Sequence, residues 1–229
     1  MRAAAQQGHY ATAYVFEETR QTYLDRMAGI NMDLREYVDS GRVAIHQVDP
    51  AELSPGELAS RLRDEVENKH ARVVVIDSLS GYVNALPNEQ FLLTQLHEML
   101  NFLSEYGVLT ILIAAQSGTI GPIQTTADVS YLADTLVLLR FFEHRGALKK
   151  AISVVKHRKS AHEDTIRELQ ITGEGVRIGS TSDANCRDAR AFRCIGDCAQ
   201  RRIDVARHLF DLDHSAGARF HRAGARRNA

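Results

Sequence analysis

The stretch RVVVIDSL, residues 72–79, decides the fold. In it, four consecutive apolar residues end abruptly on Asp77. A strand on the surface of a sheet alternates apolar and polar side chains, whereas an unbroken apolar run is typical of a strand that is covered on both faces. Strands of that kind belong mostly to parallel sheets with helices on either side. The stretch therefore predicts a buried parallel strand whose carboxyl end carries an acidic side chain.

Similar apolar runs recur along the chain and alternate with helical patterns. The other strand candidates are residues 12–16, 42–48, 109–114, 135–139 and 151–155. Ser54, followed by Pro55 and Glu57, forms a capping box with proline at the first helical position, which predicts the start of a helix. Apolar residues spaced three or four apart over residues 92–106 predict a second helix that ends at Gly107. The alternation predicts an α/β fold with a mainly parallel sheet flanked by helices.

The pattern changes towards the end of the chain. Three closely spaced strand candidates are residues 136–142, 148–157 and 166–172. Their short connections predict antiparallel strands added at the C-terminal edge of the sheet. After Gly179 arginine, alanine, histidine and aspartate dominate and lysine is absent. We expect residues 1–179 to form the folded domain and residues 180–229 a disordered or weakly helical tail, for which a shifted reading frame is an alternative origin.

The overall composition excludes several classes of protein. With 28 basic and 29 acidic residues, the net charge of -1 gives no signal for nucleic acid or a membrane surface. The apolar runs are too short to cross a bilayer and the N-terminus has no secretory pattern, so we expect a cytoplasmic protein. Three cysteines, Cys186, Cys194 and Cys198, favour free thiols over a disulfide framework. A metal site that includes His208 and His214 is the alternative, but the spacing matches no common zinc pattern.

Asp77 is the first candidate for chemistry. A carboxylate at the carboxyl end of a buried strand is the arrangement of a Walker B element, which holds Mg²⁺ directly or through water while the metal bridges nucleotide phosphates. The alternative is that Asp77 only caps the turn or helix that follows. The stretch by itself leaves both interpretations open.

Glu17 and Glu18 also follow an apolar run, in AYVFEE at residues 13–18. In a parallel sheet this end and the end at Asp77 open on the same crevice, where one carboxylate can hold a metal ion and another can deprotonate an attacking water. The alternative is that the two glutamates begin a helix over residues 19–27, where acidic side chains favour the positive end of the helix dipole.

A third candidate is the cationic segment VKHRKSAH at residues 155–162. Strand alternation places Lys156 and Arg158 on one face, and such a pair suits the γ-phosphate of a nucleotide bound by a neighbouring subunit. The alternative is an edge strand that is protected by charge. We expect His162 to be neither a switch nor a ligand.

Together these elements resemble the KaiC branch of the RecA-like ATPases, the family of the circadian clock protein. The resemblance runs from about Arg2 to Gly179. It is carried by FEE at 16–18, VVVIDSLS at 73–80, YLADTLVLLRFFEHRG at 131–146 and AISVVKHRKSAHEDTIRELQIT at 151–172. The resemblance implies a RecA-like fold that binds ATP and Mg²⁺, and ring hexamers with ATP at each subunit interface.

The resemblance also implies a role for each matching residue. Glu17 and Glu18 match the catalytic glutamates, and Asp77 matches the Walker B aspartate. Lys156 and Arg158 match residues that reach the nucleotide across a subunit boundary.

The sequence departs from the family pattern at two places. No GxxxxGK[ST] phosphate-binding loop occurs, and the chain opens at residues that resemble the helix after that loop. We therefore expect an N-terminally truncated domain, through a start placed too late or a natural truncation, with negligible ATP hydrolysis by the isolated chain. The family's adjacent phosphorylated serine and threonine match Ser130 and Tyr131, so Ser130 is the remaining candidate phospho-acceptor.

These observations predict a KaiC-like ATPase segment that transfers the γ-phosphoryl group of ATP to water and, through a serine/threonine kinase activity, to a protein hydroxyl. The alternative is a non-catalytic assembly or signalling module that contributes Lys156 and Arg158 to a partner's ATP site, in a homo-oligomer or a mixed ring with an intact paralogue. DNA recombination is a third use of the RecA-like fold, which the near-neutral charge does not support.

Overall fold

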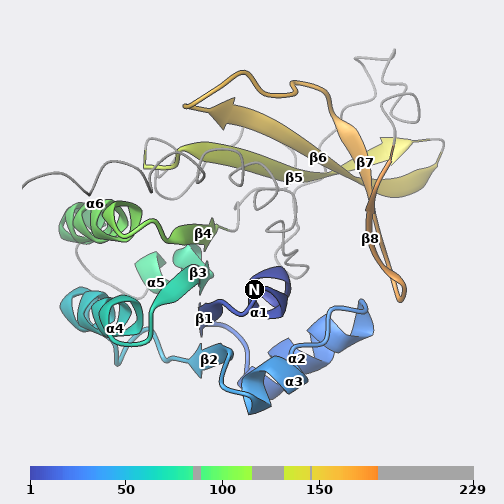
Figure 1. The fold of residues 1–229 in the computed structure, drawn as a ribbon. Coiled ribbons are helices and arrows are strands. Elements are labelled where there is room, and N and C mark those ends of the chain that lie inside the picture. The colour runs from blue at the N-terminus through green and yellow to red at the C-terminus, as the bar shows by residue number, and fades with distance from the viewer. Residues whose placement is uncertain (85–88, 115–131, 145, 180–229) are drawn as a thin grey trace, which may run out of the picture.

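The computed structural model describes residues 1–84, 89–114, 132–144 and 146–179. They form a four-stranded parallel sheet followed by a four-stranded antiparallel sheet (Figure 1). The parallel strands are β1 (Tyr10–Val15), β2 (Val43–Gln47), β3 (Ala71–Asp77) and β4 (Leu109–Ile113). Their order is β2-β1-β3-β4, and every pair is parallel. The α/β fold with a mainly parallel sheet is confirmed.

Helices cover both faces of the parallel sheet (Figure 1). One face carries α1 (Arg2–Gln6), α2 (Arg20–Gly29) and α3 (Arg35–Asp39), and the other α4 (Pro55–Glu67), α5 (Leu79–Asn84) and α6 (Glu89–Glu105). Alternate strand residues enter two cores. Tyr14 and Ile76 pack in the core with α4 and α6, whereas Val15 and Val75 pack in the core with α2. Because both faces are buried, these strands carry no polar alternation.

The start of α4 and the end of α6 lie where the sequence predicts them. Ser54 Oγ accepts a hydrogen bond of 3.2 Å from the backbone N–H of Glu57, and Pro55 is the first residue of α4. Four apolar side chains of α6 are buried: Leu92, Leu96, Met99 and Leu103. The pattern also included Tyr106, but this side chain is 46% exposed, beyond the end of α6. Gly107 follows with φ of +67°, the left-handed conformation that ends helices.

The antiparallel strands are β5 (Thr135–His144), β6 (Ala147–His157), β7 (Arg167–Thr172) and β8 (Gly175–Ile178). They pair in chain order and form a sheet of their own. The described strands thus pair in two sheets, and the antiparallel strands that the sequence predicts after the parallel sheet are confirmed. Antiparallel pairing follows from the short turns between these strands.

The turn between β7 and β8 lies against the C-terminal end of α2 (Figure 1). Asn31 Nδ2 donates a hydrogen bond of 3.3 Å to the carbonyl oxygen of Glu174. Asn31 has a φ of +57°, a conformation that asparagine tolerates better than most residues, and its own carbonyl accepts from the Arg2 guanidinium. One residue therefore joins α1, α2 and the antiparallel sheet.

One carboxylate is buried between α4 and the strands, away from the acidic strand ends. Glu65 is 3% exposed, and Tyr10 Oη donates to its Oε2 at 2.6 Å. His46 Nε2 and Lys69 Nζ each lie 3.0 Å from its Oε1. Burial raises the pKa of Glu65, but the hydrogen bonds from these three partners outweigh it and lower the pKa to about 2. Burial beside this carboxylate also raises the pKa of Tyr10 and of Tyr14, which stacks on His46.

Several sequence predictions fall outside the described residues. They concern the tail at residues 180–229 with its three cysteines, and the candidate acceptor Ser130. Within the described ranges, no helix has the length and apolar character that crossing a membrane requires.

Candidate functional site

The carboxyl ends of β1 and β3 lie next to each other. Val15 pairs with Asp77 in the ladder, and the backbone N–H of Phe16 donates to the Asp77 carbonyl oxygen at 2.8 Å. The next residues of the first strand are Glu17 and Glu18, so three carboxylates gather at this end of the sheet. We call this group of Glu17, Glu18 and Asp77 the strand-end site.

The sequence left open whether the glutamates begin a helix. Helix α2 starts at Arg20, and its N-cap is Thr19, whose hydroxyl accepts from the Thr22 N–H at 3.1 Å. Glu17 and Glu18 therefore precede the helix cap and do not form its first turn. Asp77 is not the cap of the next helix either, because Ser78 Oγ accepts from the Gly81 N–H at 3.1 Å in α5. The cap alternatives do not account for the three carboxylates.

Glu17 is held from the side of α5. Ser78 Oγ donates a hydrogen bond of 2.7 Å to Glu17 Oε1, so one hydroxyl both caps the helix and orients the carboxylate. Gly81 leaves the necessary room, since a Cβ at that position would stand 2.7 Å from Glu17 Oε1. Asp77 and Ser78, joined by a cis peptide bond, are each 1% exposed, whereas Glu17 is exposed.

In the native protein, Gly81→Ala is expected to lower about tenfold or more the turnover of any reaction in which Glu17 takes part, without destabilising the fold. Alanine is favoured over glycine in a helix by about 0.5–1 kcal/mol, but its methyl group displaces the flexible Glu17 carboxylate from Ser78. A misplacement of about 1 Å at a reacting group can cost about 100-fold in rate. Turnover and the thermal midpoint are measured on both proteins, with Gly56→Ala, where a Cβ meets nothing within 4 Å, as the matched control. Equal turnover in the two variants would contradict this role of Gly81.

Glu18 and Asp77 share a guanidinium that the sequence did not single out. Arg26 Nη2 lies 2.7 Å from Glu18 Oε1 and 3.8 Å from Asp77 Oδ2. Arg26 is in the last turn of α2, two helical turns after the Thr19 cap and on the same side of the helix. This spacing from an N-cap is the only signal in the sequence that points to it.

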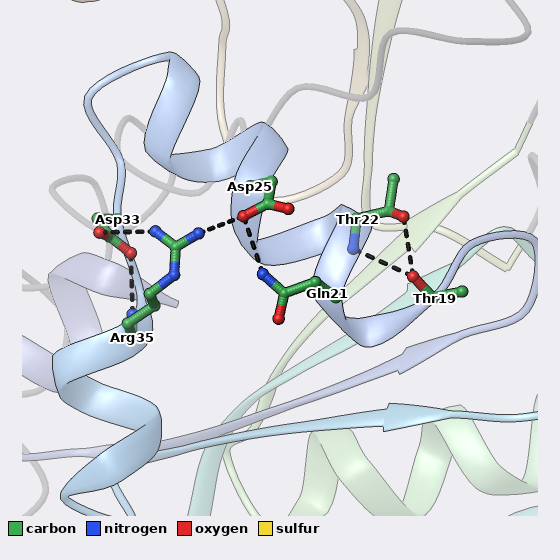
Figure 2. A network of polar contacts seen from close by, with 6 residues as sticks. All are labelled: Thr19, Gln21, Thr22, Asp25, Asp33 and Arg35. Carbon is green, nitrogen blue, oxygen red and sulfur yellow. Dashed lines mark hydrogen bonds and ion pairs between the residues drawn. The ribbon is translucent and has the colours of Figure 1, made fainter.

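Helix α2 is fixed by a network of polar contacts, which Figure 2 shows. The Arg35 guanidinium joins Asp33, at 3.0 Å, to Asp25 of α2, which also accepts from Gln21 Nε2 at 3.0 Å. The backbone N–H of Arg35 donates to Asp33 and, with the guanidinium, lowers the pKa of that exposed carboxyl. With the Thr19 cap, these contacts set the position from which Arg26 reaches the strand-end site.

Of the candidate trans cations, Lys156 lies in β6 and Arg158 directly follows that strand. Lys156 pairs with Leu136, and β7 pairs only with residues 150–152 of the same strand. The backbone N–H of Arg158 donates to the Asp134 carbonyl at 2.9 Å, and its guanidinium lies 3.6 Å from the Asp134 carboxylate. Arg158 and His162 are exposed. The trans role of Lys156 and Arg158 and the charged-edge alternative both remain predictions.

The strand-end site offers oxygen donors that suit Mg²⁺. In the described part of the chain, no group of three or more histidine, cysteine, aspartate or glutamate side chains is arranged to hold a metal ion alone. Mg²⁺ is usually held by one or two carboxylates together with substrate phosphates and water. The guanidinium of Arg26 between Glu18 and Asp77 is itself a sign that this place favours positive charge. Asp77, buried at the strand end, is the residue that would hold the ion.

Comparisons with known proteins bear on this geometry. A family model described as "ATPase: KaiC" matches residues 2–183. The chain belongs to this KaiC ATPase family. The KaiC resemblance inferred from the sequence is therefore confirmed, and with it the RecA-like character of the parallel sheet and its helices.

Several clock proteins of this family are similar to the chain. Circadian clock protein KaiC3 of Synechocystis sp. is 24% identical over 176 residues, 75% of this chain and 34% of that protein. The circadian clock oscillator proteins KaiC of Thermosynechococcus vestitus and Synechococcus elongatus are each 26% identical, over 78% and 73% of this chain respectively. The chain thus spans about a third of the length of these KaiC relatives, 34% and 32% for the last two.

Proposed function

We propose that this chain is an ATP-binding part of a KaiC-type signalling ATPase, with Mg²⁺-dependent phosphoryl transfer from ATP to water at the strand-end site. The observation that carries the proposal is that the buried Asp77 and Glu18 share the Arg26 guanidinium at the adjacent ends of two parallel strands, with Glu17 next along the chain. Ligands of open α/β sheets bind beyond the carboxyl ends of the strands, which is where this group lies.

The residues divide the chemistry by position. Asp77 would hold Mg²⁺, which when bound neutralises charge on the nucleotide phosphates. Glu17, exposed and oriented by Ser78, is the better placed of the two glutamates to take a proton from an attacking water. Glu18, which is tied to Arg26 at 2.7 Å, contributes negative charge beside the metal-holding residue.

Lys156 and Arg158 would act on the nucleotide of a neighbouring subunit in a ring, which we propose to be a hexamer. A guanidinium that reaches a γ-phosphate across an interface stabilises charge that develops in the transition state. Asp134 keeps the exposed Arg158 guanidinium near the end of β6. Transfer to the Ser130 hydroxyl is a second proposed reaction, at a residue outside the described part of the chain.

A non-catalytic role in assembly is the second candidate, favoured by one observation. None of the five lysines follows a glycine, so these 229 residues contain no GK pair of a phosphate-binding loop. We therefore expect negligible turnover by these residues alone, although Lys156 and Arg158 would still serve an intact neighbour. An oligomer that forms without nucleotide in size-exclusion chromatography, or joins a KaiC-type ATPase in a mixed ring, would favour this candidate.

Asp77→Asn tests the proposed function. Asparagine keeps the shape of the side chain but removes the charge that holds Mg²⁺, so the gain in ATP affinity on adding Mg²⁺ is expected to fall about tenfold or more. Fluorescent ATP is titrated into the native protein, purified from its own cells, with and without Mg²⁺. Asp39→Asn, at an exposed site in α3, is the matched control. If wild-type protein binds no ATP, or Asp77→Asn retains the full effect of Mg²⁺, the proposal is wrong.

A further inference from the structure

We propose that Arg26 is a further functional residue of the strand-end site. Its guanidinium takes the place of a divalent cation between Glu18 and Asp77, and it thereby makes the site reject a bare metal ion in favour of a metal–nucleotide complex. The inference rests on the proposed function, since it takes Asp77 as the residue that holds the metal.

The first argument is geometric. One guanidinium nitrogen, Arg26 Nη2, approaches oxygens of both carboxylates, at 2.7 Å from Glu18 and 3.8 Å from Asp77. A second contact, from Arg26 Nε to Glu18 Oε2 at 3.4 Å, turns the plane of the guanidinium towards Glu18. The shorter distances are on the Glu18 side, so the cation is anchored there and extends towards Asp77.

The second argument is burial. The Asp77 side chain is 1% exposed, that of Glu18 15% and that of Arg26 22%. Charges that are largely withdrawn from water interact more strongly than exposed charges and are screened less by salt. A positive group is therefore favourable at this place, and Arg26 is a positive group supplied by the chain itself.

The third argument is that Arg26 is held in position. Its guanidinium lies over the ring of Tyr23, 5.0 Å from the centroid, and that ring is buried. The helix that carries both residues is fixed through Asp25 and Arg35 and through the Thr19 cap, as Figure 2 shows. A guanidinium that is held in this way has few other conformations, so it loses little entropy when it stays between the carboxylates.

These arguments predict competition between Arg26 and a divalent cation. Arginine keeps its charge at every physiological pH, so it leaves the carboxylates only by moving away. A bare metal ion must displace it and be repelled by it. A metal ion that arrives with nucleotide also brings phosphate oxygens, which satisfy both the metal and a displaced guanidinium. Arg26 would thus set which form of the cation the site accepts.

Binding of Mn²⁺ in the absence of nucleotide tests the inference. Free Mn²⁺ is measured by electron paramagnetic resonance while the metal alone is titrated into the native protein. Arg26→Gln is expected to bind Mn²⁺ about tenfold more tightly than wild type, because a nearby positive charge has been removed. Arg26→Lys keeps the charge and is expected to bind as weakly as wild type. The matched control is Arg61→Gln, which removes an exposed guanidinium that lies 2.7 Å from Glu57.

The same titration locates the effect. Arg26→Gln is combined with Asp77→Asn, and the gain in Mn²⁺ affinity is expected to disappear in the double variant, since the bound ion needs the Asp77 carboxylate. The thermal midpoint of each variant is measured to show that the variant is folded. If Arg26→Gln does not fold, the Arg26→Lys protein still tests the inference. Binding of Mn²⁺ by Arg26→Lys that is tenfold tighter than binding by wild type would contradict the competition.

Other outcomes also overturn the inference. They are an unchanged or weaker Mn²⁺ affinity of Arg26→Gln, no measurable binding by that variant, and a gain that persists with Asp77→Asn. These results are independent of ATP. A protein that binds ATP with Mg²⁺ but shows no effect of Arg26 retains the proposed function and loses this inference. A protein that shows the Mn²⁺ effect but binds no ATP keeps the competition between Arg26 and the metal ion, and loses the proposed function and with it the preference for a metal–nucleotide complex.

Discussion

Glu17→Gln is expected to lower ATP turnover by the native protein about 100- to 10,000-fold, the usual contribution of a general base. Glutamine has the same shape and its carbonyl oxygen still accepts the hydrogen bond that Ser78 donates at 2.7 Å. It cannot accept a proton from water at neutral pH. ATP affinity and the thermal midpoint are therefore expected to stay near those of wild type while the chemical step is lost.

The measurement is phosphate release under saturating ATP and Mg²⁺, together with an ATP titration of each variant. Glu36→Gln, at an exposed position in α3, is the matched control and is expected to keep full turnover. Glu18→Gln is expected to have a smaller effect than Glu17→Gln, since Glu18 is already neutralised in part by Arg26. Undiminished turnover of Glu17→Gln would remove Glu17 as the base, and a large loss with Glu18→Gln alone would transfer that role to Glu18.

The strand ends were predictable because their signals are local. An apolar run followed by a carboxylate fixes both a buried strand and its end, so Asp77 and Glu17 could be placed on one edge before any coordinates. The start of α4 was equally predictable, since Ser54, Pro55 and Glu57 lie within four positions and the Ser54 hydroxyl accepts from the Glu57 backbone N–H. These features need no knowledge of distant parts of the chain.

Arg26 and Gly81 were not predictable in the same way. Each sits on a helix, and its role depends on which face of that helix meets the strand ends in space. Gly81 and Glu17 are more than sixty positions apart in the sequence, and only the fold places the Glu17 carboxylate where a Cβ on residue 81 would stand in its way. Periodicity predicts which side of α2 is buried, but it does not predict that a cation at the border of that side turns towards Asp77.

The antiparallel sheet shows a third kind of limit. The pairing of β5 with β6 shifts register between Leu136 and Val137. Leu136 pairs with Lys156 and Val137 pairs with Val154, so Val155 has no partner in the ladder. Such a bulge inserts one residue into a strand and changes its twist. Strict alternation across Val155 therefore fails, although the two-residue spacing of Lys156 and Arg158 lies beyond the bulge. A bulge depends on how two strands pair, so the sequence pattern of one strand does not predict it.

Glu65→Gln is expected to reduce the free energy of unfolding at neutral pH by about 3 kcal/mol, as is usual when one partner of a buried ionic cluster is removed. Glu65 is almost completely buried, and its carboxylate accepts from Tyr10 and pairs with His46 and Lys69. The neutral amide weakens all three contacts while a lysine and a histidine remain beside it. Glu67→Gln, two residues further on the exposed side of α4, is the matched control and is expected to change the free energy by less than about 0.5 kcal/mol.

The pH dependence of unfolding gives the same prediction a second, sharper test. The pKa of Glu65 is about 2 in the folded chain and 4.5 when no partner is present, so the folded state favours the ionised form. Its contribution is complete above pH 4.5 and is lost as the pH falls towards 2, by about 1.4 kcal/mol for each unit of pKa difference. Denaturant titrations between pH 7 and pH 2 should show wild type losing its advantage over Glu65→Gln in that window. If the free energies of unfolding of the two proteins fall in parallel with pH, another carboxylate governs the acid sensitivity. Glu65 is absent from the Glu65→Gln protein, so it cannot cause a pH dependence that both proteins share.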